Sequence, residues 1–294
     1  MKSILAPLRL LLVCGAFAWT NQTQAQTIVA AHYPAGAEGI KGASLPPPGV
    51  YFRDYNFFYF ANTFKDGPTS FDITAYVNAP RLIWMTDVKI LGANYGMDVI
   101  VPFGYLDWSV FGFGHSDFGL GDIQIEPLLL SWHFKQFDLA AGYAVWAPTG
   151  NHDRAKPDLI AKGFWSHMLT LGGTWYPDQE KTWAVSLLNR YEFCQEQQDT
   201  HIDPGQVYTA EWGLSKAVSK TVDVGFIGYY QQQVTKDSGP FASTKLDRKV
   251  GVGPEINVLW PKAWLFTSLR YAYEFAAVER PEGHLFTLTL TKLF

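Results

Sequence analysis

The chain has 294 residues, of which 48% are hydrophobic and 16% aromatic, while only 17% are charged. Its formal net charge is −4 and it has no basic patch, which excludes nucleic acid as a partner, because binding phosphates requires clustered Lys and Arg. Of its two cysteines only Cys194 lies beyond the N-terminal leader, which excludes an internal disulfide and a thiolate metal cluster in the rest of the chain.

The first 25 residues have the form of a secretory signal peptide. Lys2 and Arg9 give a positive start, an apolar run follows over residues 10–18, and Ala25 is a small residue at the expected cleavage point. The apolar part is too short for a comfortable membrane span, which disfavours the alternative of a single-pass anchor. Cleavage would leave 21 basic and 27 acidic residues, a net charge of −6.

The composition of the remaining chain favours a membrane β-barrel. No segment after the leader approaches the roughly 18 consecutive apolar residues that a membrane helix needs. In a barrel the apolar residues occupy alternate positions and aromatic side chains gather at the two interfaces, which accounts for 11 Trp, 15 Tyr and 21 Phe. A secreted soluble β-sandwich is the competing class, but it usually carries fewer aromatic and more charged residues.

From Tyr51 onward we expect an all-β protein, a transmembrane antiparallel up-and-down β-barrel of about 12 strands forming one domain. Tilted strands of about 9 to 11 residues cross a bilayer, and closure of the barrel satisfies every backbone group. The chain thus divides into a signal peptide (1–25), a Pro/Gly-rich segment (26–50) and the barrel (51–294). The expected strands are 51–62, 71–85, 88–102, 121–134, 137–147, 167–177, 182–193, 206–217, 222–234, 247–259, 264–275 and 284–294.

Several of these strands alternate between an apolar and a polar face. In the last strand Phe286 and Leu288 lie opposite Thr287, and in the strand before it Arg270 and Glu274 share the polar face. The dry core of a sandwich would not accept such charges unpaired, so these faces favour a polar barrel lumen.

The connections between the expected strands alternate in length. Outer-membrane barrels have short periplasmic turns and longer external loops, so this alternation places both termini in the periplasm. The short turns are Thr86 with Asp87, Lys135 with Gln136, 178–181, 218–221 and 260–263, and the long connections are 63–70, 103–120, 148–166, 194–205, 235–246 and 276–283.

Charged residues on the polar faces are the candidate functional residues. They could line a lumen and set what passes, or form salt bridges that fill a narrow interior, and the two interpretations are compatible. The candidates are Arg53, Glu126, Arg190, Glu192, Glu211, Glu255, Arg270 and Glu274.

The segment 32–49 ends in three consecutive prolines followed by a glycine, so it can form neither helix nor strand there. It could lie in the periplasm as a disordered lead or fold into the lumen. Its apolar ends and its prolines favour an ordered path, so we expect a plug or constriction.

No catalytic, metal or cofactor site is predicted. Residues 112–117 contain a His, a Ser and an Asp, but neighbours in sequence do not make a triad, and we expect a flexible loop there. Residues 151–153 and the pair His201 and Asp203 offer too few ligands for a metal.

Two motifs carry a resemblance to a known family. The sequence HYPAGAEGIKGA at 32–43, followed by LPPPG at 45–49 and RDYN at 53–56, resembles the opening of a bacterial outer-membrane family named for the meta-cleavage pathway of phenol degradation. The sequence FGLGDI at 118–123, followed by Pro127, is similar to its internal signature. Lys292 departs from the family pattern, since the position two before the final Phe294 is usually apolar.

The resemblance implies a passive outer-membrane channel or transporter for small hydrophobic or aromatic compounds, associated with aromatic-compound catabolism and without enzymatic activity. Its expected partners are outer-membrane lipids, such solutes, and the barrel-assembly machinery, which would act on the C-terminal strand. A structural or adhesive barrel and a membrane-embedded lipid hydrolase or acyltransferase are the alternatives.

Overall fold

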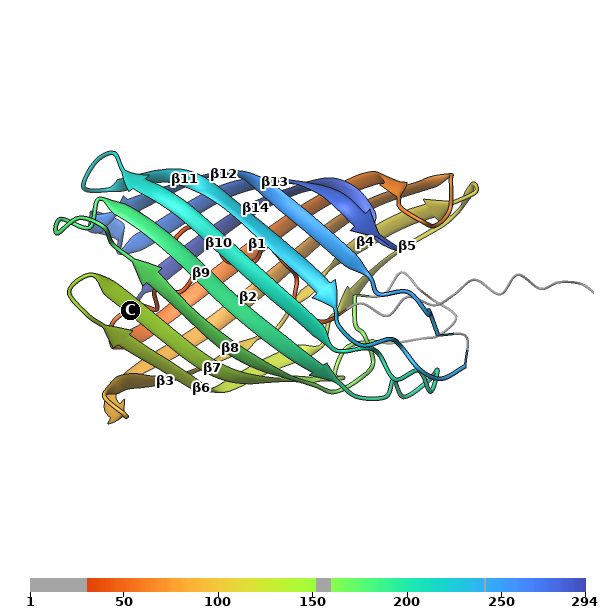
Figure 1. Cartoon of the computed structure of the whole chain (residues 1–294), viewed down its shortest axis with the longest axis horizontal. Helices are drawn as coiled ribbons and strands as arrows, with labels where there is room; N and C mark the ends of the chain where they lie inside the picture. Colours follow the sequence, from red (N-terminus) through yellow and green to blue (C-terminus); the bar gives the residue numbers. More distant parts are fainter. Residues whose placement is uncertain (1–30, 152–159, 241) are drawn as a thin grey trace, which may run out of the picture.

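The computed structural model describes residues 31–151, 160–240 and 242–294, so the expected signal peptide lies outside the described residues. The strands form one antiparallel sheet in which β1 pairs with both β14 and β2, which closes a ring of β1, β2, β3 and β6 to β14 (Figure 1). This confirms the predicted barrel of twelve strands. The strands are β1 Gly49–Phe64, β2 Phe71–Ile90, β3 Ala93–Ile100, β4 Phe103–Val110, β5 Phe113–Leu120, β6 Ile123–His133, β7 Phe137–Ala147, β8 Ser166–Trp175, β9 Trp183–Cys194, β10 Val207–Ala217, β11 Val222–Gln233, β12 Arg248–Trp260, β13 Leu265–Val278 and β14 Pro281–Leu293.

The two ends of the barrel differ, and we name them by their connections. The turn end carries the connections 91–92, 134–136, 176–182, 218–221 and 261–264, of which the last contains the 3-10 helix Pro261–Ala263, and it also carries the C-terminal Phe294. The loop end carries the connections 65–70, 148–165, 195–206 and 234–247, the short connection 279–280 and the β4–β5 hairpin (Figure 1). The parts of the chain that the structure describes contain no helix with the length and apolar character of a membrane span.

The hairpin β4–β5 is an addition to the expected topology. The first half of β2 pairs with β4 and its second half with β3, so the hairpin leaves the ring where β3 gives way to β4. The expected loop 103–120 is therefore wrong: it forms two strands joined at Phe111 and Gly112, whose φ angles of 52° and 80° suit a tight hairpin turn.

Two expected connections also differ. Thr86 and Asp87 are no turn, because β2 runs through them to a turn at Leu91 and Gly92, again with positive φ at both residues. The expected long connection 276–283 is only two residues, 279–280, since β13 and β14 extend further than the sequence pattern indicated.

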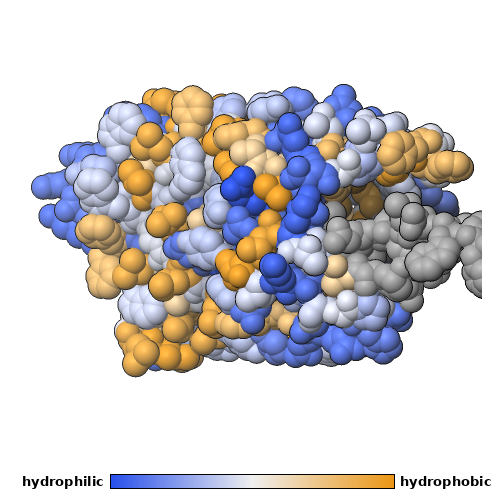
Figure 2. Space-filling model, turned by 45° about the vertical axis from the view of Figure 1, so that its right-hand side comes forward, coloured by the Kyte–Doolittle hydropathy of each residue, from blue (hydrophilic) through white to orange (hydrophobic). Residues whose placement is uncertain are grey.

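The wall follows the period of two that the sequence predicts. In β9 the exposed Val185 and Leu187 point outward, while their neighbours Ser186 and Leu188 are buried inside. Many large apolar side chains are exposed on the outer faces of the strands, and in Figure 2 apolar patches are spread over the left half of the view, with hydrophilic residues at its left edge and through its right half. Such an apolar outer face is the surface that a bilayer requires of a barrel.

The interior is filled from within by the N-terminal residues. We call residues 31–48 the plug segment. Its Ala35, Ala37 and Ile40 are buried against inward side chains of the wall such as Phe57 and Tyr229. The plug segment runs through the lumen to the turn end, where Gly49 begins β1.

Candidate functional site

Three wall carboxylates hold the backbone of the plug segment. A segment with no strand partner needs other acceptors for its N–H groups, and a buried carboxylate accepts such bonds strongly. Glu192 of β9, Glu211 of β10 and Glu255 of β12 provide them. The bonds are donated by His32 and Tyr33 to Glu192 at 2.9 and 3.2 Å, by Gly36 and Glu38 to Glu211 at 2.9 and 3.2 Å, and by Ile40 to Glu255 at 2.6 Å.

The side chain of Glu38 lies at the centre of a buried arginine cluster. Tyr55 donates a hydrogen bond to it at 2.9 Å. Burial alone would disfavour the carboxylate, but the surrounding guanidinium groups outweigh it and lower the pKa of Glu38 to about 2. The nitrogen-to-oxygen distances are 3.4 Å to Arg53, 3.3 Å to Arg81 and 3.9 Å to Arg190, and Arg270 adds a longer-range attraction.

The cluster is balanced by carboxylates of the wall. Arg81 pairs with Asp98 and, at 3.0 Å, with Glu126. Arg190 pairs with Glu211 at 2.7 Å and Arg270 lies 3.8 Å from Glu255. Buried charges persist only when they are paired and hydrogen-bonded, so the plug segment and the wall are mutually dependent.

The eight candidate residues therefore fall into two groups. Arg53, Glu126, Arg190, Glu192, Glu211, Glu255 and Arg270 bind the plug segment or a partner within the arginine cluster. Glu274 stands apart, because it accepts hydrogen bonds from Tyr59 and Tyr229 and pairs with Lys249. Sequence reasoning missed Glu38, Arg81 and Asp98, and the role of all these residues in selectivity stays a prediction.

A histidine fixes the other end of the plug segment. His32 contacts Asp122 at 3.1 Å and Glu192 at 3.0 Å through its two ring nitrogens, and it stacks on Trp146 with 5.3 Å between ring centroids. Burial opposes the imidazolium, but the hydrogen bonds to these two carboxylates prevail and raise the pKa of His32. Asp122 lies between β5 and β6, so this contact joins the plug segment to the place where the β4–β5 hairpin meets the ring.

Glycines let the plug segment approach the wall closely. A Cβ added to Gly39 would lie 2.2 Å from the carboxylate oxygens of Glu255, the acceptor of the Ile40 N–H. Gly36 has a φ of +87°, and a Cβ there would lie 2.7 Å from Tyr229. These close approaches account for two of the three glycines of the opening motif.

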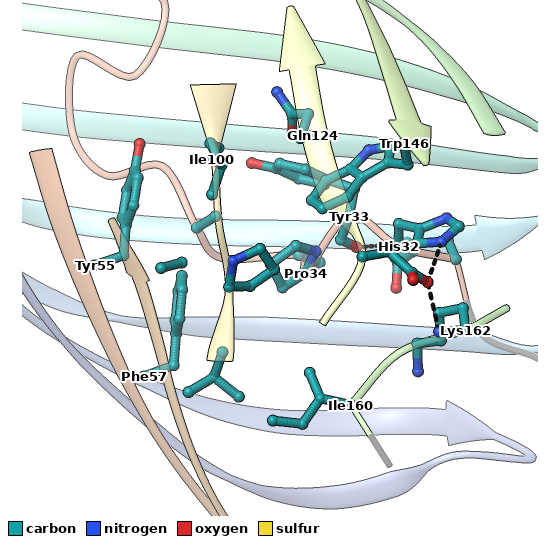
Figure 3. A pocket seen from close by; sticks show the side chains of 18 of the residues that line it. His32, Tyr33, Pro34, Tyr55, Phe57, Ile100, Gln124, Trp146, Ile160 and Lys162 are labelled. Carbon is teal, nitrogen blue, oxygen red and sulfur yellow. Dashed lines mark hydrogen bonds and ion pairs between the residues drawn. The ribbon is translucent and has the colours of Figure 1, made fainter. Parts of the chain in front are cut away.

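The plug segment divides the lumen into two cavities. The loop-side cavity has a volume of about 340 Å³ and is lined largely by apolar and aromatic side chains, including Tyr55, Phe57, Ile100 and Trp146 (Figure 3). The turn-side cavity of about 360 Å³ has a more polar lining. Five residues line both cavities, and we call them the partition: Glu38, Tyr55, Arg81, Glu126 and Arg190.

Two Ser–His–Asp arrangements occur among the described residues: Ser166, His32 and Asp122, in which His32 is also held by Glu192 and serves to fix the plug segment, and Ser131, His133 and Asp138 at the turn end. Ser131 lies 2.8 Å from Nε2 of His133, whose Nδ1 lies 3.0 Å from Asp138. Ser131 is 1% exposed, and none of the three lines the loop-side or turn-side cavity. Tyr176 connects Asp138 to Ser44, so the chain of bonds ties β6 and β7 to the plug segment.

The segment 112–117 is part of the β4–β5 hairpin rather than a loop, and its His115 and Ser116 lie on β5 outside the ring. Within residues 31–151, 160–240 and 242–294 no cluster of His, Cys, Asp and Glu has the arrangement of a metal site.

The barrel is similar to solved outer-membrane proteins. The COG4313 outer membrane channel from Pseudomonas putida F1 shares 16% identity with a TM-score of 0.75, over 89% of this chain and 99% of that one. The translocator domain of the autotransporter NalP from Neisseria meningitidis shares 10% identity with a TM-score of 0.55, over 86% and 91%. At these identities the likeness establishes an outer-membrane β-barrel fold.

A search of the curated proteins gave no match. The sequence resemblance is nevertheless confirmed by a family model described as "Putative MetA-pathway of phenol degradation", which matches residues 56–290. Because the match covers most of the chain, the protein belongs to this family.

Proposed function

We propose that the protein is a passive outer-membrane channel for small hydrophobic or aromatic molecules, serving the catabolism of aromatic compounds. The observation that carries the proposal is the loop-side cavity, a space of about 340 Å³ inside the barrel with Phe57, Ile100 and Trp146 in its lining. Ligand sites for small apolar molecules are concave, mostly apolar and of about 300 Å³ or more. The likeness to an outer membrane channel supports transport over catalysis.

The partition argues against an open aqueous path along the barrel axis. Arg81 pairs with Glu38 and Glu126, and Arg190 lies 3.9 Å from Glu38, so a polar solute would have to separate buried ion pairs. The loop-side cavity also touches Pro102 and Leu106, where β4 departs from the ring. This supports a route that leaves the cavity sideways, through the wall where the β4–β5 hairpin departs from the ring, into the apolar layer of the membrane.

The proposed orientation puts the turn end and Phe294 in the periplasm and the loop end outside the cell, as is usual for outer-membrane barrels.

Flux into vesicles tests the function. Refolded protein in lipid vesicles should admit a small aromatic solute faster than it admits arabinose, a polar solute of similar size. Ala79→Phe, which places a ring in the loop-side cavity, should reduce aromatic flux several-fold. Val185→Phe on the exposed outer face of β9 is the matched control and should leave it unchanged. Equal flux through native protein and Ala79→Phe, or faster entry of arabinose, would overturn the proposal.

A further inference from the structure

Lys162 lines the loop-side cavity. Lys162 belongs to the connection between β7 and β8, and its backbone N–H donates to Asp122 at 2.6 Å, which fixes the residue at the cavity wall. Its ammonium makes no hydrogen bond or ion pair with any residue that the structure describes. Burial lowers the pKa of Lys162 to about 8; the nearby charges of Arg280 and Lys249 add to this effect, and the carboxylates of Asp122 and Glu192 oppose it.

Two further cations line the same cavity. Lys249 of β12 pairs with Glu274 at 2.9 Å, and Arg280, between β13 and β14, pairs with Asp247 at 2.8 Å. The Nε of Arg280 is buried and has no hydrogen-bond partner in the described part of the chain. Buried polar groups are almost always satisfied, so the buried Nε of Arg280, with the half-buried ammonium of Lys162 beside the same cavity, marks a place for an acceptor.

The carboxylates around the cavity are already engaged. Asp122 and Glu192 hold His32, and Glu274 holds Lys249. Glu38 is held by the arginine cluster at the partition. Asp122 and Glu192 share the one positive charge of His32, so the formal charges at this end of the cavity balance, and Lys162 is the cation without a direct carboxylate contact among the described residues.

The opposite side of the cavity is apolar. Figure 3 shows Lys162 and His32 on one side, with Tyr55 and Phe57 on the other and Ile100 between them. A ligand that spans the cavity would thus meet a cationic group at one end and aromatic rings at the other. Its volume of about 340 Å³ accommodates a bicyclic ring system with one substituent.

We infer that the loop-side cavity binds amphiphilic carboxylates, molecules with one carboxylate on an aromatic or aliphatic body, and that Lys162 and Arg280 receive the carboxylate. This inference rests on the proposed function and names the class of solute. A neutral molecule would offer Lys162 no negative charge, and a cationic amphiphile would be repelled by it. A carboxylate gains a charge-assisted hydrogen bond there, while its apolar body is removed from water.

Three naphthalene derivatives of nearly equal size test the inference: 2-naphthoate, 2-naphthamide and 2-naphthylmethylammonium. Their dissociation constants are measured on the refolded protein in nanodiscs, with empty nanodiscs as the blank. Native protein should bind 2-naphthoate at least about tenfold more tightly than 2-naphthamide, which equals about 1.4 kcal/mol. The ammonium compound should bind most weakly.

Lys162→Gln should lower the affinity for 2-naphthoate to that for 2-naphthamide and leave the affinity for the amide unchanged. Arg280→Gln should act in the same direction, and it replaces Lys162→Gln in the test if that variant folds poorly. Lys220→Gln, at an exposed lysine of the turn end, is the matched control. Equal affinity of native protein for naphthoate and naphthamide, or unchanged selectivity in Lys162→Gln, would overturn the inference while vesicle flux still supported the channel. Failure of all three probes to enter vesicles would refute the proposed function as well.

Discussion

Replacing Glu38 by glutamine removes the negative charge around which Arg53, Arg81, Arg190 and Arg270 converge. The shape of the side chain is kept, so the variant tests charge rather than packing. Breaking a buried ion pair by neutralising one partner costs about 3 to 5 kcal/mol, because the other charge stays buried without compensation. Arg81 and Arg190 keep wall carboxylates, so we take the lower figure, about 3 kcal/mol.

We call the plug segment docked when it lies in the lumen as in the structure. The arginines belong to the wall, so this free-energy cost destabilises the docked state relative to the undocked one. At about 1.4 kcal/mol per factor of ten, the undocked population should rise about 100-fold. Single-channel recordings in planar bilayers measure it as a rise in the frequency of open events. Glu180→Gln at an exposed turn is the control, and deletion of residues 32–43 gives the conductance of an unplugged barrel. If the deletion conducts and Glu38→Gln behaves as native protein, the arginine cluster does not hold the plug segment and the reasoning is wrong.

Acid should have the same effect as the substitution. The pKa of Glu38 is lowered from 4.5 to about 2, so its contribution to docking is complete above pH 4.5 and is lost as the pH falls through about 2. Titration of Glu38 should therefore not open the channel at mildly acid pH.

Three further perturbations have directions fixed by the structure. Gly39→Ala forces a Cβ against Glu255 and should raise the open frequency by at least about tenfold, measured as above. Because the pKa of His32 is raised in the docked state, protonation of its ring stabilises docking. This stabilisation is complete below the ordinary pKa of 6.5 and is lost as the pH rises through the raised pKa. Open frequency should therefore increase toward alkaline pH in native protein, but not in His32→Gln. Leu187→Lys, on the outer face at mid-strand, should lower the free energy of refolding into vesicles by about 2 to 4 kcal/mol; a cost as small as that of Glu180→Lys would show that this face meets no lipid.

The wall could be predicted from the sequence wherever its two faces differ in polarity. From β8 to β14 the expected strands overlap the observed ones, because hydroxyl and charged residues face the lumen there. In β2 both faces are apolar: Leu82 and Trp84 point outward, while Ile83 and Met85 pack inside. Because the sequence does not alternate in polarity there, the two polar residues after Met85, Thr86 and Asp87, indicate a turn, whereas β2 continues through them.

The centre of the site could not be found in this way. Glu38 lies in a segment without periodicity, and only the tertiary fold brings it to the arginines of the wall. Arg81 did leave a signal, since it stands between Pro80 and Leu82 in a strand of apolar character. A charge in such a strand has to face inward and find a partner, and Asp98 and Glu126 on the following strands of the ring were available.

Asp122 connects the plug segment to the wall beside the β4–β5 hairpin. Its substitution therefore leads to a final prediction that differs from those for the other residues of the plug segment. Its carboxylate accepts hydrogen bonds from the backbone of Gly150, Lys162 and Gly163 at 3.1, 2.6 and 3.2 Å, and it also holds His32. In Asp122→Asn an amide nitrogen replaces one acceptor oxygen and faces donors, which costs about 1 to 3 kcal/mol for each bond left unmade.

The variant should both raise the open frequency and speed hydrogen exchange at the amides of Lys162 and Gly163. Glu192→Gln supplies the comparison, because Glu192 holds His32 and Tyr33 but none of the β7–β8 backbone that Asp122 binds. It should raise the open frequency alone. If Asp122→Asn also opened the channel without faster exchange at these two amides, plug release and loosening of the wall would be independent events, and a sideways route through the wall beside the β4–β5 hairpin would lose its structural link to the plug segment.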